Sequence, residues 1–247
     1  VGQTTIDYYA NPAERAEVLA TLGTGGLIRG REILFRRADG SEFWALLSAE
    51  RLMFDGRPAL VAAIWDLTRQ KSLEERLRHA ALHDALTGLA NRALFEGQLR
   101  SEIARASRNP GYRFAVLYID LDGFKRVNDL LGHAVGDAVL GKIAEQLTAT
   151  IRATDTAARL GGDEFAALVV GFHDASEVDQ IAERLREVLR VPYVHDGTEH
   201  HVTASIGAVV VDARLQSPDE ILKRADAAMY RVKYSTRPPE NVGRGAP

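Results

Sequence analysis

The sequence has no cysteine in its 247 residues, which excludes disulfide bonds and thiolate metal sites. It also has no run of about 18 apolar residues, so no segment is expected to span a membrane. The formal net charge is only −3 and long blocks of like charge are missing, which argues against a general nucleic-acid-binding protein. Hydrophobic residues make up 46% and charged residues 26%, which is typical of a folded, soluble protein of one or two domains.

The chain also lacks a signal peptide, and it begins with Val1 instead of methionine. We therefore expect a fragment of a longer protein, with a cytoplasmic location. Such a protein can carry a sensor or a membrane segment outside the fragment.

The first region, residues 1–67, predicts a helix followed by three antiparallel strands. The run "NPAERAEVLATL" places Pro12 near the start of the helix, where proline is tolerated. Asp39-Gly40 and Asp55-Gly56 separate the strand-like runs, and Asp-Gly between alternating runs is a strong hairpin signal. The three runs are residues 31–38, 42–54 and 58–67.

Residues 68–83 predict a helix with a narrow apolar seam. Leu73, Leu77 and Ala80 are spaced by four and three residues, and Thr68 is the expected helix cap. Two interpretations stay open, because two heptads are too few to decide from the pattern alone. The helix either packs on its own domain or forms a dimeric stalk that joins two domains.

From residue 84 to residue 235, helices and strands alternate, which predicts an α+β domain, an α/β sandwich with a mixed, mainly antiparallel sheet. Hairpins are expected around Gly161-Gly162 and around Asp196-Gly197. The tail, residues 236–247, is expected to be disordered. Helices are expected at 92–107, 124–131, 136–151, 176–190 and 218–234, and strands at 113–122, 155–161, 164–171, 191–195 and 199–211.

The stretch "RLGGDEFAAL", residues 159–168, places two glycines and two carboxylates at the tip of an apolar hairpin. The glycines permit a backbone with positive φ that approaches a ligand closely. If the strand that ends at Asp120 pairs beside this hairpin, Asp120 and Asp163 converge, while Asp122 is expected to point the opposite way. Carboxylates at one edge cannot all stay ionised without compensation. Mg²⁺, a hard cation that binds carboxylates and phosphates, would supply that compensation.

Beyond Asp120, the run "DGFKRVNDLLG" turns directly into a helix. The free N–H groups of its first turn, with Gly123 and Lys125, predict a phosphate-binding end. Asn128 and Asp137 can present a donor and an acceptor to a base edge, and an aspartate that faces a ring N–H and an amino group would select guanine. These residues indicate a nucleotide with a metal ion, and a structural acid cluster is the equally weighted alternative.

The motif "RLGGDEF" resembles the signature of the GGDEF domains, the diguanylate cyclases. The resemblance covers most of residues 84–235 and implies the palm-like fold of nucleotidyl cyclases. Residues 1–71 resemble the second half of a PAS sensor domain and end in "WDLTRQK", so residues 1–67 are expected to be the C-terminal part of a PAS-like domain. The further matching segments, in the family's order, are "DALTGLANR" (84–92), "DLDGFKRVND" (120–129), "GHAVGDAVL" (132–140), "RATD" (152–155), "ASIG" (204–207) and "RADAAMYRVK" (224–233).

The resemblance implies an enzyme that condenses two GTP into cyclic di-GMP and two pyrophosphates, as a homodimer with one GTP on each domain. Asp120, Asp163 and Glu164 are then catalytic and, with the Leu121 carbonyl, hold two Mg²⁺ ions, for which Mn²⁺ is a possible substitute. Isolated lysines at a surface are usually only solvated, and an asparagine can simply cap a turn, so each assignment has a structural alternative. The implied GTP-binding residues are Gly123, Phe124, Lys125, Asn128, Asp137, Gly161, Gly162, Lys233 and Arg237.

The C-terminal end of the sequence departs from the GGDEF pattern, and a second segment resembles a regulatory site. Family members usually continue after the last helix with Gly-Arg-Asn and a strand, whereas here Pro238-Pro239 follow Arg237 and disfavour a strand. "RATD" resembles an inhibitory product site, which implies that cyclic di-GMP binds Arg152 and Asp155, with Arg184 supplied by a neighbouring domain. The alternative is an arginine at a helix end and an aspartate that holds the turn.

Three functions remain open from the sequence. The intact acidic motif and Asp120 favour an active cyclase. An inactive GGDEF domain that binds GTP or cyclic di-GMP as a regulatory module is the second possibility. A fragment that only dimerises is the third.

Overall fold

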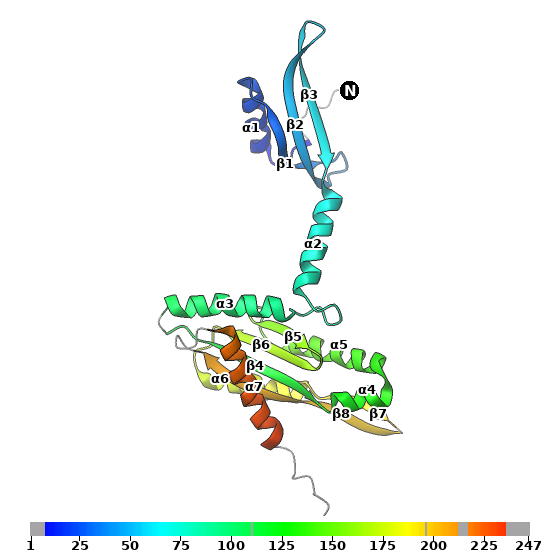
Figure 1. The fold of residues 1–247 in the computed structure, drawn as a ribbon, viewed down its shortest axis with the longest axis vertical. Helices are drawn as coiled ribbons and strands as arrows, with labels where there is room; N and C mark the ends of the chain where they lie inside the picture. Colours follow the sequence, from blue (N-terminus) through cyan, green and yellow to red (C-terminus); the bar gives the residue numbers. More distant parts are fainter. Residues whose placement is uncertain (1–7, 110, 196, 212–216, 236–247) are drawn as a thin grey trace, which may run out of the picture. The chain divides into compact units, whose positions relative to one another are not determined.

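The computed structural model describes residues 8–109, 111–195, 197–211 and 217–235. The chain forms two compact units, Val1–His79 and Ala80–Pro247 (Figure 1). Arg237 and the tail at 236–247 lie outside the described residues. In the described part of the chain, no helix has both the length and the apolar character needed to cross a membrane.

The first unit is a helix packed on an antiparallel sheet, as the sequence predicts. Helix α1 (Pro12–Gly23) precedes strands β1 (Ile28–Arg36), β2 (Glu42–Phe54) and β3 (Arg57–Asp66), which lie in the order β1-β2-β3. The Asp55-Gly56 hairpin is confirmed, because both residues have positive φ, 49° and 70°. The core of this unit consists of Val18, Leu22, Ile28, Ile33, Phe35, Ala45, Leu47 and Ala49.

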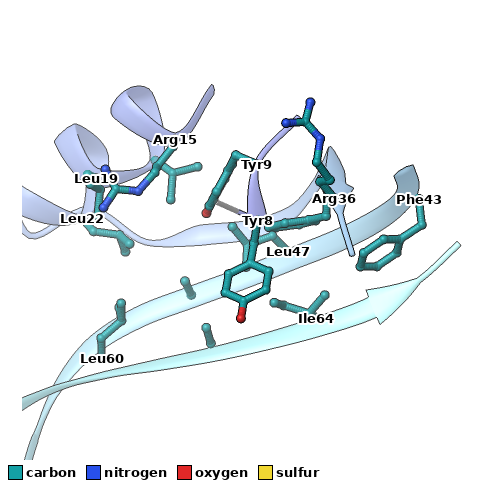
Figure 2. A pocket seen from close by; sticks show the side chains of 14 residues that line it. Tyr8, Tyr9, Arg15, Leu19, Leu22, Arg36, Phe43, Leu47, Leu60 and Ile64 are labelled. Atoms are coloured by element: carbon teal, nitrogen blue, oxygen red, sulfur yellow. The ribbon is translucent and has the colours of Figure 1, made fainter. Parts of the chain in front are cut away.

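An apolar cavity of about 260 Å³ lies between α1 and the sheet. Figure 2 shows Leu19 and Leu22 of α1 on one side and Leu47, Leu60 and Ile64 of the strands on the other. The large side chains of β3, Leu60, Val61, Ile64 and Trp65, stay more than half exposed, and the main contacts of α1 are with β1 and β2. This architecture does not by itself identify a PAS sensor, so that assignment remains a prediction.

Helix α2 (Thr68–Leu82) follows β3 and buries none of its own residues. Leu73 is 47% exposed and Leu77 is 70% exposed, so the interpretation that this seam packs on its own domain is not what the described residues show.

The prediction that Thr68 caps the helix is wrong. Thr68 is already helical, and its N–H donates to Oδ1 of Asp66 at 2.8 Å. The side-chain hydrogen bond of Thr68, then that of Arg37 and then this backbone bond lower the pKa of Asp66 to about 2.

The second unit holds a five-stranded sheet in the order β5-β6-β4-β8-β7. Its strand pairs are all antiparallel, so the predicted mixed sheet is corrected to an antiparallel one, with an isolated parallel bridge between Ala90 and Ala158. The strands are β4 (Phe114–Asp122), β5 (Thr156–Gly161), β6 (Glu164–Val170), β7 (Val191–His195) and β8 (Thr198–Val211). The helices are α3 (Arg92–Arg108), α4 (Phe124–Leu131), α5 (His133–Thr150), α6 (Ala175–Val188) and α7 (Pro218–Ser235).

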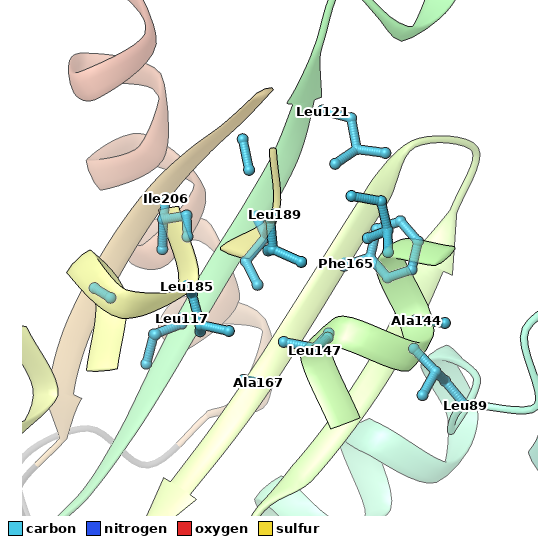
Figure 3. Packing of buried hydrophobic residues seen from close by; sticks show 14 of the residues in the cluster. Leu89, Leu117, Leu121, Ala144, Leu147, Phe165, Ala167, Leu185, Leu189 and Ile206 are labelled. Atoms are coloured by element: carbon cyan, nitrogen blue, oxygen red, sulfur yellow. The ribbon is translucent and has the colours of Figure 1, made fainter. Parts of the chain in front are cut away.

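Helices cover both faces of this sheet and give the predicted α+β sandwich (Figure 1). Leu117, Ile119 and Leu121 of the central strand β4 face α4, α5 and α6. Figure 3 shows Leu117 beside Leu185, and Phe165 and Leu147 belong to the same cluster. The alternate residues of β4 face α3 and α7. Both faces of β4 are buried, so its residues are apolar along most of the strand. The two aspartates come only at its C-terminal end, where the burial is less complete.

Candidate active site

The Gly161-Gly162 turn joins β5 to β6 at one edge of the sheet. Both glycines have positive φ, 149° and 51°. A Cβ atom at either position would meet no atom within 4 Å, so backbone conformation and not crowding demands glycine here. Leu160 and Phe165 are buried on the two sides and anchor the turn. Asp163 and Glu164 follow this turn, and both are partly exposed.

The sequence predicts that Asp120 converges with Asp163. In the structure, β4 pairs with β6, and the residue directly opposite Asp120 is Glu164, which follows Asp163 in the chain. The N–H of Leu121 donates to the carbonyl oxygen of Asp163 at 3.3 Å, which ties the turn to the end of β4. Residues that are directly opposite in an antiparallel pair share a face, so the carboxylates of Asp120 and Glu164 emerge on the same side.

Lys233 of α7 reaches into this group of acids. Its Nζ contacts Oδ2 of Asp120, and the two side chains are 23% and 14% exposed. Burial favours the neutral amine, but the hydrogen bond to Asp120 and the charges of Asp120, Asp122 and Asp163 outweigh burial and raise the pKa of Lys233. Lys233 is thus a fixed cation that partly compensates the clustered carboxylates.

The prediction that Asp122 points away from Asp120 is wrong. Residues two apart in a strand lie on the same face, and both carboxylates are close enough to Lys233 to affect its pKa. Asp122 accepts hydrogen bonds from Ser205 at 3.0 Å and from Thr203 at 3.3 Å. Burial raises the pKa of Asp122 overall, although the bond from Ser205 and the charge of Lys233 lower it, and the charge of Asp120 adds to the rise. Because residues two apart in a strand share a face, the spacing of Asp120 and Asp122 in the sequence already indicates that their side chains lie on the same side of the sheet.

A cavity of about 550 Å³ adjoins the acids and the start of α4. Gly123 precedes α4 with φ 78°, and no side chain caps this helix end. The amide groups of the first turn are therefore the kind of anion-binding group that the sequence predicts. Of the predicted metal and GTP residues, the cavity is lined by Leu121, Gly123, Phe124, Lys125, Asp163 and Lys233.

The two predicted base-reading residues lie on neighbouring helices, Asn128 on α4 and Asp137 on α5. Gly136 of α5 lets the side chain of Asn128 approach the backbone of α5 closely. This contact is not among the predictions from the sequence. A Cβ at Gly136 would lie 1.9 Å from Oδ1 of Asn128 and 3.3 Å from the Phe124 ring. The feature of the sequence that indicates this contact is a glycine inside a helix, where glycine lowers the stability of the helix by about 1 kcal/mol relative to alanine.

The predicted inhibitory residues make contacts within the chain. Asp155 accepts hydrogen bonds from the N–H groups of Arg152 at 3.0 Å and Val170 at 3.1 Å. Arg152 lies 3.6 Å from Glu177, and Arg184 donates to the carbonyl of Thr150 at 3.0 Å. The structural alternative, an aspartate that holds the turn, thus describes Asp155 here. Binding of product at these residues remains a prediction.

The chemistry of the donor set suits a hard divalent cation. Asp120, Asp163, Glu164 and the Leu121 carbonyl offer only oxygen atoms, which Mg²⁺ prefers. Within the described residues, however, no three carboxylate, imidazole or thiol side chains already cluster closely enough to hold a metal ion. The ammonium of Lys233 contacts Asp120 instead. A cation at Asp120 would therefore require the lysine to move.

A second group that the sequence reasoning missed is the pair Arg159–Asp84. Nε and Nη2 of Arg159 donate to the carbonyl of Gly162 at 3.0 Å and 2.8 Å, and Nη1 lies 3.1 Å from Asp84. The two side chains are only 12% and 25% exposed. Burial raises the pKa of Asp84, but hydrogen bonds from Thr87 and Arg159 outweigh burial and lower it. Arg159 therefore ties the glycine turn to the segment that precedes α3.

We expect Arg159→Ala to destabilise the second unit by about 3 kcal/mol, because it leaves the carboxylate of Asp84 without its buried partner. The effect should shrink at low pH. The pKa of Asp84 is lowered in the folded chain, so its contribution is present above its ordinary value of 3.8 and is lost as the pH falls below it. Urea unfolding at pH 7 and pH 3 measures both.

The matched control is Arg100→Ala, which removes an exposed pair with Glu96 at 3.8 Å. Such a pair contributes less than about 1 kcal/mol, so little change is expected. Equal losses in the two variants would contradict a specific role for Arg159.

Comparison with known proteins places this site in a family. The family described as "Diguanylate cyclase, GGDEF domain" matches residues 81–238. The chain is 44% identical over 157 residues to the bifunctional diguanylate cyclase/cyclic di-GMP phosphodiesterase MucR of Pseudomonas aeruginosa, covering 64% of this chain and 23% of MucR. It is 40% identical over 162 residues to the diguanylate cyclase TpbB of the same species, covering 65% of this chain and 37% of TpbB.

Among solved structures, the coiled coil and GGDEF domain of DgcB from Caulobacter crescentus, in complex with c-di-GMP, has a TM-score of 0.62 at 31% identity. The match covers 68% of this chain and 89% of that one. The chain spans between 16% and 25% of the lengths of four curated relatives that it matches. The family match covers well over half of the 247 residues and includes the whole group of acids at the glycine turn. This chain therefore belongs to the GGDEF family of diguanylate cyclases.

Proposed function

We propose that this chain condenses two molecules of GTP into cyclic di-GMP and two pyrophosphates, acting as a homodimer. The observation that carries the proposal is the pairing of β4 with β6, which sets Asp120 opposite Glu164 beside the cavity that Asp163, Lys125 and Lys233 line. Carboxylates next to two lysines and an uncapped helix start suit a nucleoside triphosphate with a divalent cation.

The reaction requires two bound nucleotides. The 3′-oxygen of one GTP attacks the α-phosphorus of the other, the bond from that phosphorus to the bridging oxygen breaks, and pyrophosphate leaves. A second attack of the same kind closes the ring. Because one domain is expected to bind one GTP, two copies must face each other.

The chain's residues then have distinct tasks. Asp120, Asp163, Glu164 and the Leu121 carbonyl would hold Mg²⁺, which supplies Lewis-acid stabilisation of the nucleophile and the phosphates when it is bound. Glu164 would also help to ionise the attacking hydroxyl. Lys233 would leave Asp120 and, with Lys125 and the first amides of α4, bind the triphosphate. Asn128 and Asp137 would bind guanine, and Arg237 is proposed as a further phosphate ligand.

Incubation of the purified chain with GTP and Mg²⁺, followed by chromatography of the nucleotides, tests the proposal. Cyclic di-GMP with pyrophosphate is expected in a ratio of one to two. Calorimetric titration with a non-hydrolysable GTP analogue runs in parallel. Binding without turnover would replace the enzyme by the alternative function, a regulatory module that binds GTP or cyclic di-GMP.

Product inhibition is a separate prediction. Arg152→Ala should abolish inhibition by cyclic di-GMP, because it removes a guanidinium that can bind a phosphate or a guanine edge through paired hydrogen bonds. Inhibition of the wild type should be non-competitive with GTP, since the bound product would hold two domains apart instead of occupying the GTP cavity. Calorimetry with cyclic di-GMP and initial rates measure both effects.

Arg224→Ala is the matched control. Arg152 is 56% exposed and lies near Glu177, and Arg224 is 57% exposed and pairs with Glu220 at 2.8 Å. The control should keep product binding and inhibition. If Arg152→Ala binds and responds to product as the wild type does, the assignment of Arg152 is wrong.

A further inference from the structure

Glu164 has two neighbours that lie outside the predicted site. Glu164 is the first residue of β6 and faces Asp120 across the strand pair. Tyr118 precedes Asp120 by two residues in β4, so its side chain lies on the same face as Asp120 and Glu164. Diagonal neighbours on one face of a sheet are within reach of an aromatic side chain.

The Tyr118 ring is buried, with 6% of the residue exposed, in the layer that also holds Phe95 and Val116. Glu164 and Arg92 lie close enough to its hydroxyl to affect its pKa, and Asp226 contributes a further negative charge. Burial, followed by the charge and hydrogen bond of Glu164, raises the pKa of Tyr118 to about 12. A tyrosine hydroxyl is a donor at neutral pH, so from this position on β4 it can donate to the carboxylate of Glu164.

Arg92 approaches the same carboxylate from another element. It is the first residue of α3, and its Nη2 lies 3.9 Å from Oε2 of Glu164. A neutral donor from β4 and a cation from α3 thus flank one carboxylate at the start of β6. A partly exposed glutamate side chain otherwise has several rotamers, and each partner reduces that freedom.

We propose that Tyr118 and Arg92 are positioning residues that fix the carboxylate of Glu164 for the reaction of GTP. The inference rests on the proposed function and extends it to two residues that touch neither GTP nor its phosphates in that proposal. If Tyr118 only filled the core, phenylalanine, which has the same ring, would serve equally well, since β4 is otherwise apolar from Phe114 to Ile119.

The first test is a double-mutant cycle with Tyr118→Phe and Glu164→Gln. Loss of a hydrogen bond to a charged group should lower kcat by about tenfold, with the KM for GTP changed less than about twofold. In the Glu164→Gln background, Tyr118→Phe should lower kcat by less than about twofold, because the carboxylate that it positions is gone. An equal loss in both backgrounds would show a role unrelated to Glu164 and overturn the inference.

Tyr112→Phe is a matched control. The hydroxyl of Tyr112 also donates to a carboxylate, that of Glu102, and the pKa of Tyr112 is likewise raised to about 12, by burial first and then by Glu102. Tyr112 belongs to neither the acids nor the cavity beside them, so kcat should stay at the wild-type value. For the second neighbour, Arg92→Gln should lower kcat, and Arg92→Lys should restore part of the loss because it keeps the charge.

The second test does not need turnover. Mn²⁺ is titrated by calorimetry into the chain that carries a non-hydrolysable GTP analogue. A less ordered Glu164 should weaken Mn²⁺ binding by about fivefold in Tyr118→Phe, and Tyr112→Phe should bind as the wild type does. If the wild type forms no cyclic di-GMP, the proposed function fails, and this titration alone decides the positioning inference. Wild-type affinity in Tyr118→Phe would overturn it.

Discussion

Asp163→Ala should lower the rate of cyclic di-GMP formation by several orders of magnitude, a loss of about 4 kcal/mol or more of transition-state stabilisation. Asp163 is proposed to hold the divalent cation, and it lines the cavity beside the acids. The fold should survive. The bond between Leu121 and the turn uses the backbone oxygen of Asp163, and the flanking residues Leu160 and Phe165 stay buried.

Initial rates, with thermal unfolding of the same samples, measure this prediction. Asp120→Ala should cause a loss of similar size, and it also frees Lys233 from its carboxylate partner. Asp179→Ala, which removes a carboxylate on α6, is the control for charge alone. A folded Asp163→Ala variant with wild-type activity would remove Asp163 from the catalytic assignment.

The parts of the fold that depend on local rules could be predicted from the sequence. Asp55-Gly56 made a hairpin because both residues accept positive φ, and Gly161-Gly162 made a turn for the same reason. The buried strand β4 could be read from its apolar run. The sequence also predicts that the strand ending at Asp120 pairs beside the Gly161-Gly162 hairpin, and β4 does pair with β6, although the residue opposite Asp120 is Glu164.

Two local predictions are wrong. The prediction that Asp122 points away from Asp120 contradicts the two-residue period of a strand, which puts both on one face. The prediction that Thr68 caps α2 rests on residue type alone, but Asp66, two residues earlier, accepts the free N–H. Residue type alone does not say which of two neighbouring oxygen-bearing side chains reaches that group.

Contacts between distant segments could not be predicted in this way. Arg159 and Asp84 are 75 residues apart, and their ion pair exists only because the chain before α3 runs beside β5. Tyr118 looked like one more apolar residue of a strand, and its partner Arg92 lies on α3. Such pairs are consequences of packing, and no spacing rule within one element encodes them.

Activity is expected to depend on dimerisation through α2. Replacing both Leu73 and Leu77 by glutamate should lower specific activity by about a hundredfold at concentrations where the wild type is saturated as a dimer, because an apolar seam becomes charged. The helix itself should persist, since neither leucine is buried in the described chain. In the wild type, specific activity should rise with protein concentration below saturation.

A charge exchange tests the geometry of the same seam. If Leu73, Leu77 and Ala80 face a second copy in parallel, Arg69 and Glu74, five residues apart, take the g and e positions, and each can pair with the opposite charge of the partner helix. Arg69→Glu should then weaken the dimer, and the double variant Arg69→Glu, Glu74→Arg should restore it. Each exposed pair contributes less than about 1 kcal/mol, so these shifts are smaller than those of the leucine variants. Sedimentation at several concentrations, with rates on the same samples, measures association and activity together. A chain that is monomeric at every concentration, with unchanged specific activity, would rule out the dimer and the stalk.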